Sequence, residues 1–416
     1  MAKKSAGQRS QLVDLLLHTA AALGVESDRE LAALAGVSVD NIDNWRSGAT
    51  HELKVQTLAA IKEGLARRIL ELREQARAVG ESHDGGLLAI EIEEGSSPAA
   101  LQRQFHDRVT WDYLDHRFLY FDSQGALAWE NLMRAGYDQG CWLKGVDVCA
   151  QKLIDDGVIG KRRGLDLVSL GPGEAAKEAL IAARIATLGP PWFAVALVDV
   201  SIPLLVSGTK ACRKRAAQVL PFCADFEEGP LSFARRLPSA HHDGMRVVAM
   251  LGNVFGNVRD EEVLIREHLA TLIRPGDLLW LEVALRLERV EDDPLFRMTL
   301  PAQGELTAPE ANRRLLLEGP YRRWEAAHGR RPSDLHTRVW VREGDDTCRV
   351  PGALNFCHDL VFEEQRRACT MLYSRRYDVQ GLSRWLEGIG YVMEAVVPVP
   401  DSQKRERVVH LVARKR

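Results

Sequence analysis

Long apolar runs are missing from this sequence. None of its 416 residues belongs to a stretch that approaches the roughly 20 apolar residues of a membrane-spanning helix. The first 24 residues place two lysines before an apolar segment, as a signal peptide does, but Arg9, Gln11 and Asp14 interrupt it. That pattern favours an amphipathic helix, so we expect neither a membrane anchor nor a secretory signal.

Paired cysteines and a charge excess are also missing. The seven cysteines are scattered and include no C-x-x-C pair, which argues against a disulfide framework or a zinc ribbon and for a cytoplasmic protein without metal. The formal net charge of −3 gives no global field that would attract nucleic acid or an anionic membrane.

The distribution of polar and apolar residues along the chain predicts several domains. A helical N-terminal domain is expected over residues 1–80, and a linker with one short strand over 81–116. Residues 117–285 predict a ligand-binding core and residues 286–375 an acceptor-side α+β subdomain. Residues 376–416 predict terminal strands that complete the core sheet.

Alternating strands and helices characterise the core. Each of five expected strands precedes a turn or helix, and a pair of strands near the C-terminus follows a helix at residues 379–389. This order predicts a doubly wound, Rossmann-like α/β sheet. The expected strands are residues 165–170, 193–198, 217–222, 247–251, 278–285, 390–398 and 408–413.

A glycine turn follows the first of these strands, in the sequence SLGPGEAAK at residues 169–177. Gly171 and Gly173 allow the backbone to approach a ligand, and a helix begins just after them. Glu174 disfavours a pyrophosphate, so a sulfonium cofactor such as S-adenosylmethionine (SAM) fits better than NAD. The alternative is an ordinary strand-to-helix turn without a ligand.

Acidic residues close the next two strands. Asp199 is placed to accept hydrogen bonds from both ribose hydroxyls, and Asp225 with Phe226 suits an adenine ring and its amino group. The alternatives are a helix cap at Asp199, a role that Ser201 could also fill, and a solvated acidic turn at Asp225. Since the carboxyl ends of parallel strands meet at one edge, these residues are expected to share a site.

The fourth strand is followed by LGNVFGN at residues 251–257. Asn253 and Asn257 carry amides that can accept hydrogen bonds from an amine and leave its lone pair aimed at a methyl group. The alternative is a turn that uses asparagine and glycine for their backbone freedom.

These motifs together resemble the histidine-specific N-alpha-methyltransferases of ergothioneine biosynthesis, most clearly over residues 117–300 and more weakly to residue 416. The resemblance includes LYFDSQGALAWENLM (119–133), VDVS (198–201), CADFEE (223–228) and RPGDLLWLEV (274–283). It implies a class I SAM methyltransferase fold. The implied cofactor residues are Gly171, Gly173, Lys177, Asp199, Asp225 and Phe226.

The resemblance also implies an acceptor side. Asn257 would meet the acceptor amine, and Tyr137 and Ser374 align with residues that position it. Two positions depart from the family pattern. Asn253 replaces a small hydroxyl residue, and Leu372 replaces the acidic residue that recognises the imidazole of a histidine acceptor.

The N-terminal part resembles a phage-repressor helix-turn-helix at residues 28–48. Ser38 is a candidate cap for the second helix, Ile42 and Trp45 are expected to pack inward, and a further helix is expected at residues 57–65. The second helix carries Asp40 and Asp43, which repel phosphates, so a dimer contact is favoured over DNA binding.

The sequence therefore predicts a SAM-dependent methyltransferase, with a histidine-like, other amino-acid or peptide amine as acceptor and a homodimer through the N-terminal domain. Two alternatives remain open: a SAM-sensing helix-turn-helix transcriptional regulator, and an enzyme that methylates an atom other than nitrogen.

Overall fold

The computed structural model describes two compact units, Met1–Leu88 and Ala89–Arg416. The described residues are 27–47, 60, 64, 89–93, 95–108, 113–134, 139–160, 163–216, 218–228, 231–299, 316–317, 319–328, 335–343, 348–363, 366–400 and 406–416.

The first unit contains the two helices that the sequence predicts, α2 (Asp28–Ala35) and α3 (Val39–Arg46). Ser27 caps α2 by accepting a hydrogen bond from the Glu30 N–H at 3.2 Å, and Gly36 ends it with a φ of 64°. Ile42 and Trp45 are buried, as expected. Ser38 occupies the cap position of α3, but its side chain makes no capping hydrogen bond among the described residues. The helix expected at 57–65 lies outside the described residues except for positions 60 and 64, which are helical.

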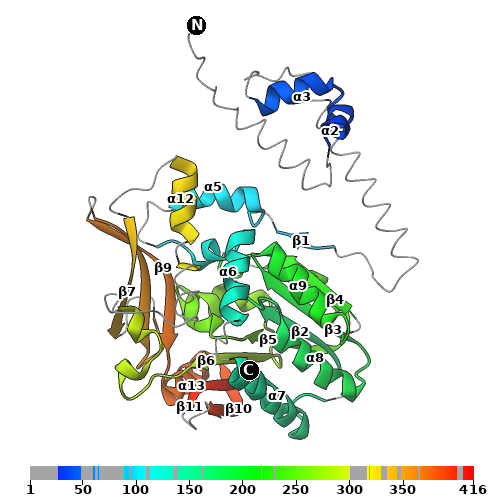
Figure 1. Cartoon of the computed structure of the whole chain (residues 1–416). Coiled ribbons are helices and arrows are strands. Elements are labelled where there is room, and N and C mark those ends of the chain that lie inside the picture. The colour runs from blue at the N-terminus through cyan, green and yellow to red at the C-terminus, as the bar shows by residue number, and fades with distance from the viewer. Residues whose placement is uncertain are drawn as a thin grey trace. The chain divides into compact units, whose positions relative to one another are not determined.

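The second unit is built on the Rossmann-like sheet that the sequence predicts (Figure 1). Its strand order is β1-β4-β3-β2-β5-β6-β11-β10, with the first six parallel and β11 antiparallel to both neighbours. Every residue of β2, β3 and β6 is buried, as expected for strands covered on both faces. The strands are β1 (Glu91–Ile92), β2 (Gly164–Leu170), β3 (Phe193–Asp199), β4 (Gln218–Cys223), β5 (Gly244–Met250), β6 (Leu278–Ala284), β10 (Tyr391–Pro400) and β11 (Glu406–Lys415).

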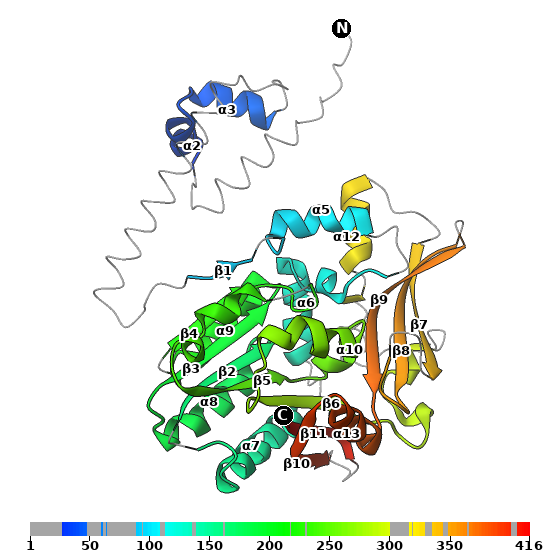
Figure 2. The same cartoon turned by 180° about the vertical axis from the view of Figure 1, so that it is seen from behind.

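Helices pack against both faces of this sheet. The helices α7 (Gln139–Asp155), α8 (Ala176–Leu188) and α9 (Ile202–Cys212) share one apolar core with the sheet. The other face packs against α13 (Val379–Gly388) and several short turns (Figure 2). Residues 260–273, where the sequence after the fourth strand predicts a helix, contain one irregular run within this second layer, with a π-helical turn at its centre. The short elements are η2 (Ser232–Arg236), η3 (Pro238–Ala240), η4 (Val254–Asn257), α10 (Glu261–Val263), η5 (Leu264–His268) and η6 (Leu269–Thr271).

The segment between β6 and α13 forms a second, antiparallel sheet of β7 (Leu335–Glu343), β8 (Leu354–Phe362) and β9 (Arg367–Arg376). Within the α+β subdomain expected over residues 286–375, the runs HTRVWV (336–341) and LVFEE (360–364) indicate strands at or near β7 and β8, whereas no run was taken to indicate β9. The two ends of this segment are hydrogen-bonded to each other: Tyr377 donates to the Ala284 carbonyl at 3.0 Å, and Arg286 donates to the Tyr377 carbonyl at 2.9 Å. The segment is therefore an insertion that leaves the main sheet and returns at one point. It also contains η7 (Val290–Asp292), η8 (Phe296–Thr299) and α12 (Gly319–His328).

The stretch interpreted as a linker, residues 81–116, contains more structure than expected. It includes α5 (Pro98–Arg108), which buries Leu101 and Phe105, and the start of η1 (His116–Leu119). Two apolar residues four apart were too little to reveal α5 in the sequence. Together with η1 and α6 (Ser123–Arg134), this stretch packs against the second sheet.

Candidate functional site

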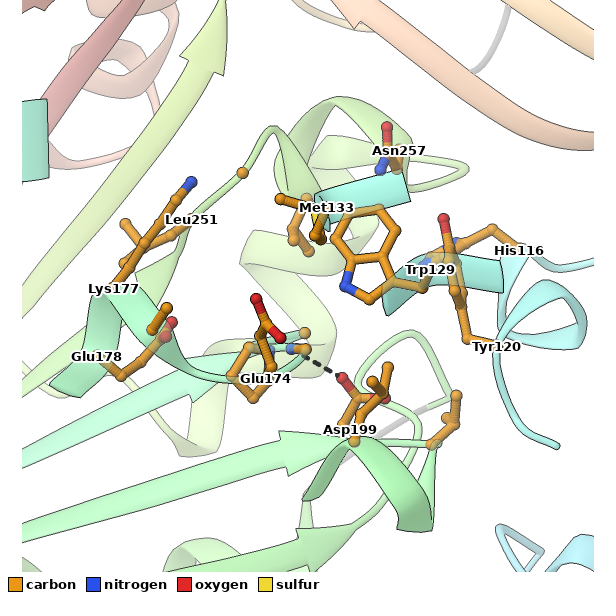
Figure 3. Close-up of a pocket in the computed structure, with 18 of the residues that line it drawn as sticks. His116, Tyr120, Trp129, Met133, Glu174, Lys177, Glu178, Asp199, Leu251 and Asn257 are labelled. Atoms are coloured by element: carbon orange, nitrogen blue, oxygen red, sulfur yellow. Dashed lines mark hydrogen bonds between the residues drawn. The ribbon is translucent and has the colours of Figure 1, made fainter. Parts of the chain in front are cut away.

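A pocket lies at the carboxyl ends of β2, β3, β4 and β5, where ligands bind in open α/β sheets (Figure 3). The ends of these strands and the segments that follow them bring together every residue that the sequence suggests for the cofactor, and also Asn257. The lining includes Gly171, Gly173, Lys177, Asp199, Asp225, Phe226 and Asn257.

The glycine turn after β2 requires its glycines. Gly171 and Gly173 have φ angles of 67° and 57°, in the left-handed region that side chains rarely adopt. A Cβ atom on Gly173 would lie 2.9 Å from Nε1 of Trp129, a residue of α6. The turn therefore places backbone without side chains at the wall of the pocket, just before α8 begins.

Asp199 closes β3 and is almost fully buried. Its carboxylate accepts hydrogen bonds from the Gly173 N–H at 3.3 Å and the Ser201 N–H at 2.9 Å. Burial raises the pKa of Asp199 to about 6. The cap position of α9 is Ser201, whose side chain makes no capping hydrogen bond among the described residues, and the Asp199 carboxylate binds the Ser201 N–H before the helix begins. Each oxygen still has a lone pair for a ligand hydroxyl.

Asp225 is held by a residue that the sequence did not indicate. Arg117 of η1 forms a buried ion pair with Asp225, whose other oxygen accepts the Glu227 N–H at 2.9 Å. Burial raises the pKa of Asp225 to about 6, although the Arg117 charge opposes that rise. His116 pairs with Glu227 at 2.9 Å and Arg117 with Glu228 at 3.0 Å, so η1 contacts this acidic loop residue by residue.

Lys177 is held in place by a buried acidic residue of β6. It forms an ion pair with Glu282 of β6, which is completely buried, and its Nζ lies 4.4 Å from the centre of the Trp142 ring. Glu282 also accepts the Gly252 N–H. The pair fixes the ammonium at the pocket wall, where it can meet a ligand carboxylate.

Glu178 adds a second buried acid beside Lys177. Its carboxyl group lies 2.6 Å from the Ser169 hydroxyl, and burial raises the pKa of Glu178 to about 7. With Glu174, Asp199 and Asp225, it gives the pocket four carboxyl groups, against the cationic Lys177 and Arg117. Such a lining favours a ligand that carries positive charge.

The loop after β5 separates its two asparagines. Asn257 lines the pocket, but the Asn253 side-chain oxygen accepts the Ala284 N–H at 2.9 Å, and Asn253 lies outside this pocket. The expectation that both amides meet an amine is therefore wrong for Asn253. Its φ of 63° is unusual for a non-glycine residue, and the Ala284 bond helps to hold it there.

An aromatic wall, which no sequence motif indicated, faces the strand ends. Trp129 of α6 lies between Asn257 and Asp199, beside Met133 (Figure 3). The Trp129 ring is perpendicular to the Tyr120 ring, with centroids 5.8 Å apart. Because these residues follow no strand, no strand-end pattern could have identified them.

The remaining acceptor-side predictions fall elsewhere. Tyr137 lies outside the described residues. Ser374 of β9 is buried, its hydroxyl accepts a hydrogen bond from Arg376 Nη1 at 3.1 Å, and it does not line the pocket. Leu372 is packed in an apolar cluster with Leu119 and Phe356, so position 372 offers no charged side chain that could bind a ligand.

The residues that line the pocket are suited to binding SAM. Asp199 is available for ribose hydroxyls, Asp225 and Phe226 for adenine, Lys177 for the amino-acid carboxylate, and the acidic lining for a sulfonium charge. A comparison with known families agrees: residues 109–288 match the model of a family described as histidine-specific, SAM-dependent methyltransferases. The protein is a SAM-dependent methyltransferase. The order of its mixed central sheet is that of class I enzymes of this kind.

Solved structures with low similarity are also methyltransferases. Magnesium protoporphyrin IX methyltransferase of Synechocystis PCC 6803, with bound S-adenosylhomocysteine (SAH), is 14% identical with a TM-score of 0.36, over 71% of this chain and 97% of that one. The 1,6-didemethyltoxoflavin N1-methyltransferase of Burkholderia thailandensis is 11% identical with a TM-score of 0.35, over 70% and 87%. The glycopeptide N-methyltransferase MtfA with SAM is 15% identical with a TM-score of 0.31, over 65% and 94%. No curated protein matches the sequence. At these scores the structural similarities say nothing about the acceptor.

The described part of the methyltransferase contains no helix long and apolar enough to cross a membrane and no group of three or more side chains that could hold a metal ion. The six cysteines described there, residues 149, 212, 223, 348, 357 and 369, have free thiols.

Proposed function

We propose that this methyltransferase transfers the methyl group of SAM to the nitrogen of an amino acid, or of an amino-acid-like or peptide amine. The observation that carries the proposal is that Asn257 lines the same pocket as the cofactor residues. Its side-chain oxygen can accept an acceptor N–H and so orient the nitrogen lone pair. Tyr137 and Ser374 stay predicted acceptor-positioning residues.

The reaction needs little from the protein beyond placement. When bound, SAM would supply an electrophilic methyl group. The nitrogen of a neutral amine would bond to the methyl carbon as the carbon–sulfur bond breaks and SAH leaves, and the methylated ammonium would then lose a proton to solvent. The chain's own residues would align the nitrogen through Asn257 and exclude water with Trp129 and Tyr120. Positioning and exclusion of water then account for most of the acceleration.

Calorimetric titration with SAM and SAH tests the cofactor assignment. Asp199→Asn removes the charge that accepts the ribose hydroxyls, a loss of about 1.5–3 kcal/mol or roughly 10- to 150-fold in Kd. Asp156→Asn is the matched control, because Asp156 is a half-exposed acid at the end of α7. Unchanged binding in Asp199→Asn would contradict the assigned site. Methyl gain on amines, followed by mass spectrometry, then tests the acceptor class.

The N-terminal unit is proposed to hold two copies of the chain together rather than to bind DNA. Asp40 and Asp43 of α3 are exposed, and neither favours a phosphate backbone. The molar mass of the full chain from light scattering tests this proposal, and a monomer would overturn it. No observation favours the alternative of a SAM-sensing regulator. A cytoplasmic location remains a prediction from the cysteines.

A further inference from the structure

A buried histidine lies behind the lysine that is assigned to the cofactor. Lys177 lines the cofactor pocket at the carboxyl ends of β2 to β5 (Figure 3), and its ammonium pairs with Glu282 of β6. His410 of β11 lies directly opposite Glu282 in the antiparallel register of the two strands, and both side chains are completely buried. Since residues directly opposite in such a pair project from the same face of the sheet, the two side chains are neighbours.

The hydrogen on the His410 ring has one position open to it. The indole N–H of Trp280, two residues before Glu282 on β6, donates to Nδ1 of His410 at 3.1 Å. An indole nitrogen only donates, so Nδ1 accepts and carries no hydrogen. Burial lowers the pKa of His410 to about 4, so the imidazole is neutral near pH 7 and carries its single hydrogen on Nε2.

This Nε2–H lies beside the oxygen of Glu282 that Lys177 does not use. Oε2 of Glu282 accepts hydrogen bonds from the Lys177 ammonium and from the Gly252 N–H. Oε1 has no hydrogen-bond partner among the described residues, and neither has Nε2 of His410. These two atoms lie 3.7 Å apart, slightly beyond a direct hydrogen bond but close enough for attraction between the carboxylate charge and the N–H dipole. The carboxylate is thus held at both of its oxygens.

The packing around His410 leaves its ring little room to turn. A Cβ atom on Gly145 of α7 would lie 2.9 Å from Nε2 of His410 and 2.4 Å from a methyl group of Val399, so the helix backbone comes close to the ring at this glycine. Trp142, on the same helix, has its ring centre 4.4 Å from Nζ of Lys177. The helix α7 therefore packs against both His410 and Lys177.

We propose that His410 is a positioning residue for the binding of the cofactor's carboxylate. Held by Trp280, it holds Glu282, and Glu282 in turn holds the Lys177 ammonium where the carboxylate of SAM binds. His410 does not line the cofactor pocket, so it acts only through these two residues. The inference rests on the proposed cofactor role of Lys177 and does not depend on which acceptor is methylated.

A matched pair of ligands isolates the carboxylate: SAM, and decarboxylated SAM, which keeps the sulfonium and the amino group. In calorimetric titrations of the full chain, the wild type should bind SAM at least about tenfold more tightly than decarboxylated SAM, as expected for a charge-assisted hydrogen bond. His410→Phe, which keeps a ring but removes both nitrogens, should reduce this preference by roughly threefold or more. Val412→Ala is the matched control, because Val412 is buried two residues further along β11 and carries no polar group. It should lower the free energy of unfolding and leave the preference unchanged.

Two further measurements show whether the effect passes through Glu282 and Lys177. In the background Lys177→Met/Glu282→Gln the preference should be nearly absent, and His410→Phe should change it no further. Nitrogen NMR of the histidine-labelled full chain should find the hydrogen of His410 on Nε2, and the Nε2 signal should move when SAM binds but not when decarboxylated SAM binds. If His410→Phe does not fold, this NMR measurement decides alone.

The outcomes separate this inference from the assignments on which it rests. Equal weakening of SAM and decarboxylated SAM in His410→Phe, or a hydrogen on Nδ1, overturns the role of His410 while Lys177 keeps its assignment. If the wild type binds both ligands equally, the assignment of Lys177 fails and this inference fails with it. N-methylation is tested separately by methyl gain on amines, and its failure with an intact preference for SAM leaves the role of His410 standing.

Discussion

The cofactor pocket and a second cavity have different linings, although Trp142 belongs to the walls of both. We call this cavity the second chamber; its lining includes Asn253, Asp293, Arg376 and Arg407. The cofactor pocket is lined by four carboxyl groups, and one of them, Asp199, is the last residue of a strand. In the second chamber the one carboxylate of the described lining, Asp293, is paired with Arg376. Positive charge on a ligand is therefore favoured in the first cavity, whereas Asp293 and Arg376 of the second neutralise each other.

The two regions also differ in how they are built. The cofactor pocket depends on the parallel sheet, whose geometry brings successive strand ends together. The second chamber depends on contacts between segments far apart in the chain, such as Asp293 with Arg376. Substitutions in the first region should therefore change the affinity for SAM, and those in the second should change kcat/KM for the acceptor.

The largest expected effect is on the cofactor side, at the pair of Lys177 and Glu282. Lys177→Met leaves the fully buried Glu282 without its partner, which typically costs about 3–5 kcal/mol. Urea unfolding should show this loss, and SAM binding should disappear. The double variant Lys177→Met/Glu282→Gln should recover most of the stability but not the SAM affinity. Normal SAM binding by the double variant would give Lys177 a structural role only.

A smaller, pH-dependent effect is expected at Arg117. Burial raises the pKa of Asp225 to about 6, and the Arg117 charge keeps it from rising further. Wild-type SAM affinity should therefore fall as the pH drops through about 6, where Asp225 and Asp199 take up protons. Arg117→Gln raises the pKa of Asp225, so its affinity should begin to fall at higher pH, by up to about tenfold per unit.

Arg117→Lys is the matched control for that profile, since it keeps the positive charge and should restore most of the wild-type pH dependence. Calorimetry between pH 5 and pH 8 makes the measurement. Parallel profiles for Arg117→Gln and the wild type, offset by a constant factor, would mean that Arg117 supports the fold without acting through Asp225.

The smallest effect is expected on the chamber side. Ser374→Ala removes one hydrogen bond to Arg376, a loss of about 1 kcal/mol in unfolding free energy. SAM affinity should stay within about twofold of the wild type, and kcat/KM for the acceptor should fall less than tenfold. A strong loss of SAM binding would show that the two regions are not separate.

Much of the cofactor side was predictable because its residues follow strands directly. Gly171, Asp199 and Asp225 each come at or just after the end of a strand, and the parallel arrangement places them together. Their roles remain predictions, although the structure brings them into one pocket. The Rossmann-like strand order could be predicted for the same reason, from repeated strand and helix patterns.

The other features of the site depend on tertiary packing, which cannot be predicted from local sequence patterns. Arg117 meets Asp225 across 108 positions, and Trp129 reaches the glycine turn from α6. The strand β9 was missed because basic residues at both of its ends hide an apolar strand, while its neighbours bury Arg375 and Arg376 through ion pairs and hydrogen bonds. Asn253 was misplaced because its backbone conformation turns the side chain toward Ala284.

The hydrogen bonds that join Ala284, Arg286 and Tyr377 bring the two ends of the inserted segment to one point of the main sheet. Near its second end, Arg375 donates to the carbonyls of Val258 and Arg259, the two residues that follow Asn257. A change of length or sequence inside the segment would therefore leave the pairing of the main strands in place, while loss of Arg375 would free the loop that carries Asn257.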